Sequence, residues 1–302
     1  MTGPVVLIAN PNAGRGQGAE AVELAARELR ERGLEVRVER TAGPGDAVAL
    51  ARQAAEQGAR TVAAVGGDGT LHEVLNGLLA RRPAPVPRLG LIPVGGGNDY
   101  ARELGLPAGD PLAAARVLAR GQVRQVDAGR LEGCEGGPEH FINNVGLGFM
   151  GLANAARERT RWIPGRASYV AGGLLALWEM RPESYTVWVD GCALSGRFPI
   201  VHVGLGRWCG AGVMLAPEAR IDNGRFEVFV HGERSKLAMG LAWGRISRGE
   251  AREDVATLRG RRVRILGPRG FVLHTDGEVR TATSGAIECT VLPGAVEVIH
   301  GG

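Results

Sequence analysis

The run Gly-Gly-Asp-Gly-Thr at residues 66–70 is the segment whose residue types point most directly to chemistry. Glycines lack a Cβ and let backbone amides approach an anion closely, and a helix starting here adds partial positive charge. Asp68 lies inside the run as a carboxylate that could hold a metal ion or orient a ligand. This combination predicts a site for nucleotide phosphates.

A strand before this glycine run and a helix after it must position the run. Residues 61–65 are an apolar segment typical of a buried strand, and the apolar side chains within residues 71–79 repeat on one helical face. A purely structural interpretation is a capping box, with Thr70 as the N-cap and Glu73 closing it. Three glycines around an aspartate exceed what a cap requires, so ligand binding is favoured.

A second glycine turn follows a predicted strand over residues 5–9 and precedes a predicted helix over residues 19–32. Lys236 is the only lysine of the chain, which excludes a Walker A loop and the lysine-dependent mechanism of protein kinases. Nucleotide phosphates must then meet an arginine, a metal ion or backbone amides, and Arg15 lies in a suitable loop. A plain strand-to-helix turn is the alternative.

A third glycine turn, at residues 93–102, follows a predicted strand over residues 89–92. Its structural alternative is that Asn98 or Asp99 simply caps the next helix. Strands and helices alternate through this part of the chain, which predicts a parallel sheet with ligands at the carboxyl ends of its strands. The other elements predicted here are a strand over residues 34–39 that ends at Thr41 and helices over residues 47–57 and 111–120.

Length and composition predict two folded domains, since 302 residues with 44% hydrophobic content can form two cores. We place the boundary at residue 130, with domains over 1–130 and 131–302, and the last residues could return to the first domain. From residue 133 the pattern becomes strand-rich, which predicts an all-β second domain interrupted by helices near residues 166–180 and 235–247.

The remaining composition limits the functional classes. The longest apolar stretch is too short to span a bilayer and no signal peptide is visible, so a soluble, cytoplasmic protein is expected. Four cysteines without paired spacing argue against a zinc site or a disulfide framework. A formal charge of +4 suits an anionic partner but is too mild to indicate nucleic acid.

Three later motifs have structural alternatives. Residues 146–151 fit the dinucleotide-binding pattern G-x-G-x-x-G, but no clean strand ending in an acid follows at the required distance, so we interpret them as part of the β-rich domain. The dipeptides Asn223-Gly224 and Asp276-Gly277 are both typical of β-hairpin turns.

Together, the three glycine turns and the sequence Asp276-Gly277-Glu278 resemble the diacylglycerol kinase catalytic domain family, which includes soluble bacterial lipid kinases and sphingosine kinases. The resemblance spans nearly the whole chain. It implies an N-terminal Rossmann-like parallel α/β nucleotide-binding domain and a C-terminal antiparallel β-sandwich for the lipid substrate, with the active site in the cleft between them.

The resemblance also implies roles for individual residues, with ATP and Mg²⁺ as cofactors. Glu278 would accept the proton of the lipid hydroxyl, Asp68 and Asp127 would organise magnesium and the acceptor, and Asp99 would lie near the substrate hydroxyl. Gly96 stands where the family has a threonine, so one side-chain contact is missing. The implied nucleotide contacts are Asn10, Pro11, Asn12, Ala13, Gly14, Arg15, Thr41, Gly66, Gly67, Gly69, Thr70, Glu73, Gly95, Gly96 and Asn98.

Residues 216–224 resemble the family's loop for a structural magnesium ion. Asn223 stands directly before the glycine, where the family usually has an acid, and an amide oxygen adds no charge to a cation site. The candidate metal residues are Arg220, Asp222, Asn223 and Arg225.

These observations predict an ATP- and magnesium-dependent kinase that converts diacylglycerol to phosphatidic acid, with phosphatidylglycerol, sphingosine or another lipid alcohol close behind. An NAD kinase and a catalytically silent nucleotide- or lipid-binding module are the alternatives. The expected partner is a lipid at the inner membrane face, without nucleic acid, and a homodimer stays possible. The candidate membrane contact, with a solvated helix face as its alternative, comprises Arg157, Arg159, Arg161, Trp162, Ile163, Arg166 and Tyr169.

Overall fold

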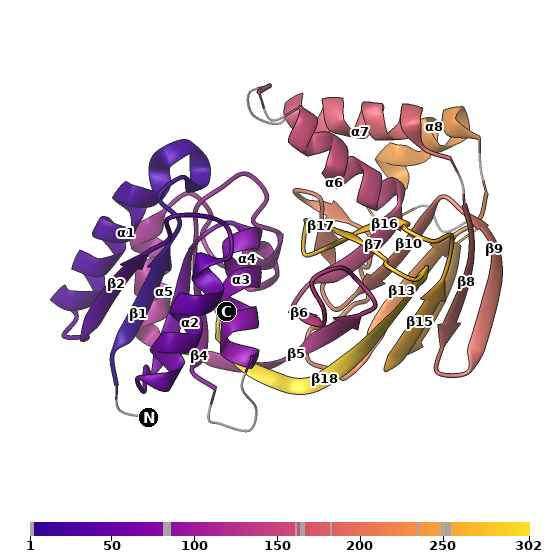
Figure 1. Ribbon diagram of the computed structural model, residues 1–302. Helices are drawn as coiled ribbons and strands as arrows, with labels where there is room; N and C mark the ends of the chain where they lie inside the picture. Colours follow the sequence, from indigo (N-terminus) through magenta and orange to yellow (C-terminus); the bar gives the residue numbers. More distant parts are fainter. Residues whose placement is uncertain are drawn as a thin grey trace. The chain divides into compact units, whose positions relative to one another are not determined.

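The computed structural model describes residues 3–302 except 81–85, 161, 164–166, 182, 234, 247, 249 and 251–254. The chain forms two compact units. The N-terminal unit contains Met1–Val126 and Gly294–Gly302, and the C-terminal unit contains Asp127–Pro293 (Figure 1). The division after residue 126 lies four positions before the boundary placed from the sequence, and the last nine residues belong to the first unit.

The N-terminal unit is built on a parallel sheet with the order β2-β1-β3-β4. The end of β18 continues this sheet, since Val298 pairs in parallel with Leu89 of β4. Every residue of β1 and β3 is buried, as expected for strands covered on both faces. The strands are β1 (Val5–Ala9), β2 (Val36–Arg40), β3 (Thr61–Gly66) and β4 (Arg88–Pro93). Strand β18 (Ala286–Ile299) belongs to this unit only from Gly294 onward.

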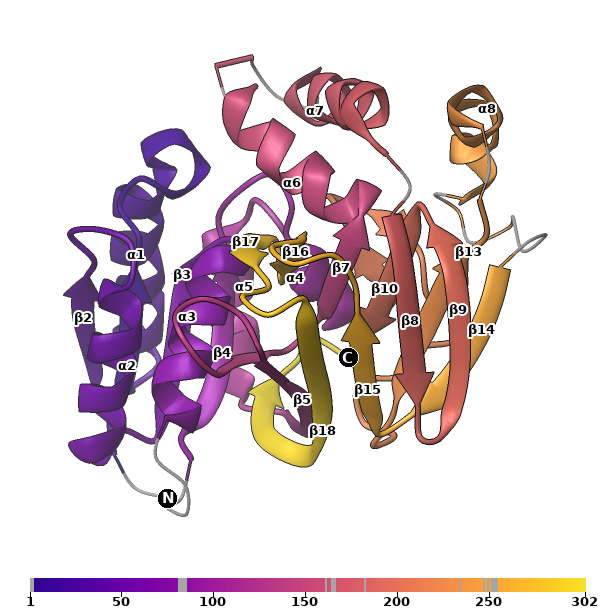
Figure 2. The same cartoon turned by 45° about the vertical axis from the view of Figure 1, so that its right-hand side comes forward.

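Helices cover both faces of this parallel sheet. Helix α1 packs with α5, and α2 packs with α3, on opposite faces (Figures 1 and 2). The connection from β1 leads to β2 on one side of β1, whereas the connection from β2 leads back to β3 on the other side of β1. The direction in which strands are added to the sheet therefore reverses between β1 and β3. The helices are α1 (Ala13–Glu31), α2 (Asp46–Glu56), α3 (Asp68–Leu79), α4 (Asp99–Glu103) and α5 (Pro111–Arg120).

The C-terminal unit contains a six-stranded antiparallel sheet with the order β14-β13-β10-β7-β16-β17. Strand β15 pairs antiparallel with β18 and β8 in a second layer. The apolar side chains of the six-stranded sheet share one core cluster with those of β15, β8 and β18, which makes this unit a β-sandwich. Strand β5 pairs with β6 and β18 beside it. The strands of this unit not yet bounded are β5 (Val123–Glu132), β6 (Glu139–Phe141), β7 (Asn144–Gly148), β8 (Glu183–Val189), β9 (Cys192–Phe198), β10 (Ile200–Gly204), β11 (Trp208–Cys209), β12 (Val213–Met214), β13 (Phe226–His231), β14 (Val255–Gly260), β15 (Arg262–Leu266), β16 (Val272–Thr275) and β17 (Glu278–Thr281).

The C-terminal unit also carries three helices among its described residues: α6 (Phe149–Arg159), α7 (Ala167–Glu179) and α8 (Lys236–Ile246). The sequence predicted the last two, but α6 was missed. It begins directly after Gly148, within the G-x-G-x-x-G pattern. Strand β7 pairs antiparallel with β10 and β16, so this pattern lacks the parallel sheet that a dinucleotide fold requires.

Among the described helices, none combines the length and apolar character needed to cross a membrane. All four cysteines are free, and Cys192 alone is exposed.

Candidate functional site

The three glycine turns of the N-terminal unit leave the parallel sheet at the same edge. Ala9 pairs with Val65, and Gly66 pairs with Pro93, so β1, β3 and β4 end at matching positions. Since the chain reverses between β1 and β3, the first two turns lie at a topological switch point, where open α/β sheets bind ligands. The sheet topology therefore supports a ligand site at this edge.

Close backbone approach joins the turns to one another. A Cβ on Gly14 would lie 2.9 Å from Cγ1 of Val94, so the first turn contacts the third at a position with no room for a side chain. The would-be Cβ of Gly95 lies 3.6 Å from Cα of Gly67, in ordinary contact between the second and third turns. The glycines thus let the three turns pack directly together.

The first turn contains a strained segment. Gly14, Arg15 and Gly16 have positive φ values of 59°, 64° and 92°, so the regular part of α1 begins after them. Arg15 is exposed and carries a Cβ, which makes this conformation unfavourable by about 1 kcal/mol. The N–H of Asn12 donates to Oδ1 of Asn10 at 3.0 Å. Backbone strain at an exposed arginine is typical of a ligand loop.

Neighbouring contacts locate the other residues predicted around the first turn. Pro11 and Ala13 are half-buried, and Ala13 donates its N–H to the carbonyl of Asn10 at 3.0 Å. Thr41 follows β2, and its N–H donates to the carbonyl of Ala9 at 2.9 Å, directly before the turn. The structure therefore brings Thr41 to the same edge.

Asp68 joins the second turn to the third. Its carboxylate accepts hydrogen bonds from the N–H groups of Asp99 at 3.3 Å and Tyr100 at 3.2 Å, the first two residues of α4. A carboxylate at a helix N-terminus satisfies unpaired N–H groups and interacts favourably with the helix dipole. Asp68 is thus a positioning residue for the third turn, a role that sequence reasoning missed.

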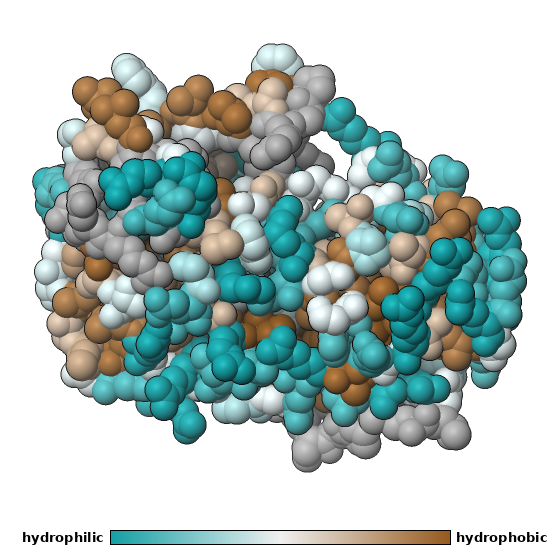
Figure 3. All heavy atoms as spheres, turned by 180° about the vertical axis from the view of Figure 1, so that it is seen from behind, coloured by the Kyte–Doolittle hydropathy of each residue, from teal (hydrophilic) through white to brown (hydrophobic). Residues whose placement is uncertain are grey.

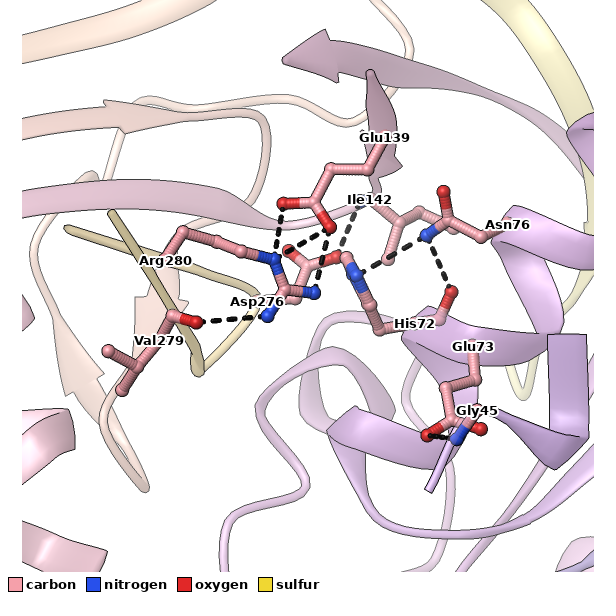
Figure 4. A network of polar contacts seen from close by, with 9 residues as sticks. All are labelled: Gly45, His72, Glu73, Asn76, Glu139, Ile142, Asp276, Val279 and Arg280. Atoms are coloured by element: carbon pink, nitrogen blue, oxygen red, sulfur yellow. Dashed lines mark hydrogen bonds and ion pairs between the residues drawn. The ribbon is translucent and has the colours of Figure 1, made fainter. Parts of the chain in front are cut away.

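The capping-box interpretation of the second turn is wrong. Helix α3 begins at Asp68 with Gly67 as its N-cap, so Thr70 lies within the first turn and is buried. Glu73 accepts a hydrogen bond from the N–H of Gly45 at 3.0 Å (Figure 4) and another from the N–H of Ala47 at 3.2 Å, both at the N-terminus of α2. Gly69 is half-buried in the first turn of α3.

The third turn contains an unpartnered buried oxygen. Asn98 has φ of 52° and donates from Nδ2 to the carbonyl of Gly95 at 2.9 Å, whereas its Oδ1 is buried with no hydrogen-bond partner among the described residues. Gly95 and Gly96 are exposed beside it. Asp99 is buried and accepts from Nη1 of Arg102 at 2.9 Å. An acceptor without a partner beside exposed amides fits a nucleotide.

In the C-terminal unit, a β-hairpin presents Glu278. Asp276 and Gly277 have φ values of 48° and 95° and connect β16 to β17, which confirms the predicted hairpin turn. The buried Asp276 carboxylate accepts from three consecutive N–H groups, those of residues 142–144, each at 2.9 Å, and Figure 4 shows the bond from Ile142. Glu278 is exposed at the first position of β17. The network on Asp276 therefore fixes the hairpin that carries this carboxylate.

His274 is a further residue of this hairpin that sequence reasoning missed. It is buried, and its Nδ1 accepts a hydrogen bond from the N–H of Gly277 at 3.3 Å. Burial lowers the pKa of His274 to about 4, although the Asp276 carboxylate acts in the opposite direction. The imidazole is therefore neutral near pH 7. The signal in the sequence that could have identified this residue is its position two residues before Asp276.

Asp127 lies with the 221–224 loop. Its Oδ2 accepts from the N–H of Gly224 at 2.6 Å, and its own N–H donates to the carbonyl of Ile221 at 2.7 Å. The Asn223-Gly224 hairpin alternative is wrong, because β13 pairs with β10 and β14 and not with a strand directly before this loop. Asp127 thus anchors a loop 97 positions away.

The candidate metal residues supply few anionic donors. Asp222 lies 3.5 Å from Nε of Arg220, and Oδ1 of Asn223 accepts from the N–H of Arg225 at 3.1 Å. No group of three or more His, Cys, Asp and Glu side chains that could hold a metal ion occurs among the described residues. One carboxylate beside the Arg220 guanidinium is a poor donor set for a hard cation. Magnesium at this loop stays a prediction.

The candidate membrane segment is only partly within the described residues. Trp162 is 81% exposed, and Arg159 forms an ion pair with Glu179 at 2.7 Å. Ile163 is half-buried. Arg161, Arg166 and the side chain of Tyr169 lie outside the described residues, and Arg157 is half-buried.

Both parts of the chain are similar to known domain families. Residues 4–131 match the diacylglycerol kinase catalytic domain, and residues 143–300 match the YegS C-terminal NAD kinase beta sandwich-like domain. A diacylglycerol kinase of Mycobacterium tuberculosis (strain ATCC 25618 / H37Rv) is 31% identical over 302 residues, which cover 99% of this chain and 95% of the relative. A diacylglycerol kinase of Bacillus subtilis (strain 168) is 30% identical, with coverage of 90% and 88%. A crystal structure of a diacylglycerol kinase from Bacillus anthracis str. Sterne, 23% identical, has a TM-score of 0.75 over 99% of this chain and 97% of that chain.

Proposed function

Because this chain belongs to the diacylglycerol kinase family of lipid kinases, we propose that it transfers the γ-phosphate of ATP to a lipid hydroxyl. Diacylglycerol, giving phosphatidic acid, is the first candidate substrate. The observation that carries the proposal is the edge where three glycine turns meet at the switch point of a parallel sheet. The exposed backbone amides of this edge and one arginine suit the phosphates of a nucleoside triphosphate.

The N-terminal unit would bind the nucleotide. Arg15 supplies the cation at the first turn, where its conformation directs it to the surface. Asp68 holds the N-terminus of α4, so the exposed amides of the third turn keep their positions. The unpartnered Oδ1 of Asn98 would accept a hydrogen bond from the nucleotide. Gly96 offers only its backbone, and nucleotide binding therefore relies on amides more than on a side-chain hydroxyl.

Glu278 would act as the general base. The lipid hydroxyl oxygen attacks the γ-phosphorus, the bond from that phosphorus to the β–γ bridging oxygen breaks, and ADP leaves. The hydroxyl proton passes to the Glu278 carboxylate, which is exposed and accepts no hydrogen bond that the described residues supply. Asp276 holds the turn before it through three backbone hydrogen bonds.

A divalent cation bound with the nucleotide would neutralise phosphate charge as the transfer proceeds. Asp68 is the carboxylate best placed for this role in the N-terminal unit, because it lies at the glycine turns. Asp99 would lie near the acceptor hydroxyl, with Arg102 holding its carboxylate. Asp127 would act indirectly, by fixing the loop at residues 221–224.

A second candidate is transfer to NAD. The likeness of residues 143–300 to a domain named for NAD kinase favours including it. In this case the glycine turns of the N-terminal unit would still bind ATP, and NAD would replace the lipid hydroxyl as the phosphate acceptor.

The experiment measures transfer of labelled γ-phosphate from ATP to a panel of lipid alcohols in mixed micelles, with NAD in a parallel reaction. Diacylglycerol product that requires Mg²⁺ and disappears in Glu278→Gln is the expected result. Product on NAD alone would replace the lipid substrate by a nucleotide. No product on any acceptor, from protein that binds ATP, would favour a silent binding module.

A further inference from the structure

We propose that the outer face of helices α7 and α8 docks on an anionic lipid bilayer. This inference rests on the proposed function, since a lipid kinase must meet a substrate held in a membrane. The docking face consists of exposed apolar side chains on the two helices and on the segment before α7: Trp162, Val170, Leu174, Trp178, Leu237 and Leu241.

The spacing of these side chains places them in one exposed apolar row on each helix. Val170, Leu174 and Trp178 recur every fourth residue, and so do Leu237 and Leu241. Residues four apart lie on one face of a helix. The six side chains are between 62% and 81% exposed, and they are the large hydrophobic residues exposed to this degree among those described. Water is an unfavourable environment for such rows.

The opposite side of the two helices is already packed. Ala176 and Met180 at α7 and Met239 of α8 belong to a buried apolar cluster that also includes Met150 of α6. A helix that is apolar on both sides needs an apolar environment on both. The protein core covers only the inner side, so the outer side requires another apolar phase.

Helix α8 contacts the end of helix α7. Lys236 donates through Nζ to the carbonyl of Trp178, which ties the start of α8 to the end of α7. A Cβ on Gly240 would lie 3.5 Å from Cδ2 of Leu177. In Figure 3, seen from behind, brown surfaces gather along the top, where Figure 1 places α7 and α8.

The segments that carry the docking face have an excess of cationic residues in their sequence, which suits an anionic membrane. Residues 157–181 contain five arginines against two glutamates, and residues 233–250 contain three arginines and one lysine against two glutamates, of which Glu250 pairs with Arg248 at 2.8 Å. Glu179 pairs with Arg159 at 2.7 Å, and Glu233 pairs with Arg197 at 3.1 Å, so these acids are neutralised. No acid occurs between residues 167 and 178 or between residues 236 and 246. Cations at an apolar helix face attract anionic headgroups.

Two tryptophans further favour a bilayer over a protein partner. Trp162 precedes α7 and Trp178 lies near its end, and the exposed fractions of their side chains are 81% and 80%. Indole rings concentrate at membrane interfaces, where the ring meets the acyl region and its N–H meets water.

The test is sedimentation of the full chain with vesicles of phosphatidylcholine alone or mixed with phosphatidylglycerol. The variant combines Leu174→Gln, Leu237→Gln and Leu241→Gln, which removes apolar area at exposed positions only. Its control combines Glu20→Gln with Arg27→Gln on the exposed side of α1, which leaves the net charge unchanged. If the triple variant does not fold, Leu241→Gln alone serves in its place.

We expect the wild type and the control to bind anionic vesicles and the triple variant to bind about tenfold more weakly or worse. Equal binding of wild type and triple variant would refute the docking face. So would a wild type that binds neither vesicle. Sedimentation velocity adds a third outcome: a variant that loses only self-association would assign the face to a second copy of the chain.

Failure of the docking face can be told apart from failure of the proposed function. Vesicle binding is measured without nucleotide, so it is readable even if no lipid alcohol is phosphorylated. Where activity is present, the triple variant should lose rate on diacylglycerol in vesicles. It should keep its rate on a short-chain diacylglycerol that is monomeric in water, because the catalytic residues are untouched.

Discussion

Asp276→Asn is expected to destabilise the C-terminal unit strongly, although the two side chains have nearly the same shape. In the wild type, Oδ2 accepts from the N–H of Ile142, and Oδ1 accepts from the N–H groups of Asn143 and Asn144. The amide that replaces Oδ2 cannot accept, so one buried N–H is left without a partner. The other two hydrogen bonds lose the charge of their acceptor.

The magnitude follows from these three bonds. An unpaired buried N–H costs about 2 kcal/mol, and each bond that changes from a charged to a neutral acceptor loses about 1 kcal/mol. We therefore expect the free energy of unfolding to fall by about 4 kcal/mol, a large share of the stability of a typical domain.

The chain offers a direct probe for this change. All five tryptophans, at positions 162, 178, 188, 208 and 243, lie in the C-terminal unit, so their fluorescence during urea unfolding reports on this unit alone. Glu278→Gln is the matched control, because Glu278 is exposed and its substitution removes the proposed base without removing a packing contact. A urea midpoint of Asp276→Asn equal to that of the control would refute the role assigned to the Asp276 network.

Three further predictions concern buried histidines and the first turn. Burial, followed by the nearby His274 and His231, lowers the pKa of His202 to about 3, and burial lowers the pKa of His274 to about 4. Below pH 6.5, the ordinary pKa of histidine, unfolding of the protein therefore takes up protons. The free energy of unfolding is therefore unaffected by these histidines above pH 6.5 and falls on acidification, by about 2 kcal/mol per histidine at pH 5. Urea midpoints that do not change between pH 7.5 and pH 5 would contradict this. Gly14→Ala places a Cβ 2.9 Å from Val94 at φ of 59°, so ATP affinity measured by calorimetry should fall at least about tenfold, and unchanged affinity would separate the first turn from nucleotide binding. Arg15→Gly should raise stability by about 1 kcal/mol by relieving positive φ while raising KM for ATP, and a variant that is neither more stable nor weaker in ATP use would show that this residue has neither role.

Much of the fold could be predicted because its signals are local. The strand predicted over residues 5–9 is β1 at the same bounds, and the one predicted over residues 61–65 is β3, which extends one residue further. An apolar run followed by glycines defines a buried strand and its turn without reference to the rest of the chain. The Asp276-Gly277 hairpin was predictable for the same reason, since the dipeptide itself favours the required φ values.

Helix α6 and the outer face of α7 could not be predicted in this way. Helix α6 begins at Phe149 directly after Gly148, without a polar side-chain cap, so its first apolar residues resemble a continuation of the strand before it. The apolar character of α7 was visible, but which of its sides is covered depends on where α6 and α8 pack.

The sequence by itself determined the family, the two-part architecture and the identities of the acidic and glycine residues that could do chemistry, because short local motifs specify each of them. Only the tertiary structure decided what most of the acids do. Asp68, Glu73, Asp127 and Asp276 accept from backbone N–H groups that lie 31, 28, 97 and 134 positions away. A backbone donor carries no residue-type signature, so which amides remain unpaired, and which carboxylate reaches them, is settled only when the sheets and helices have formed.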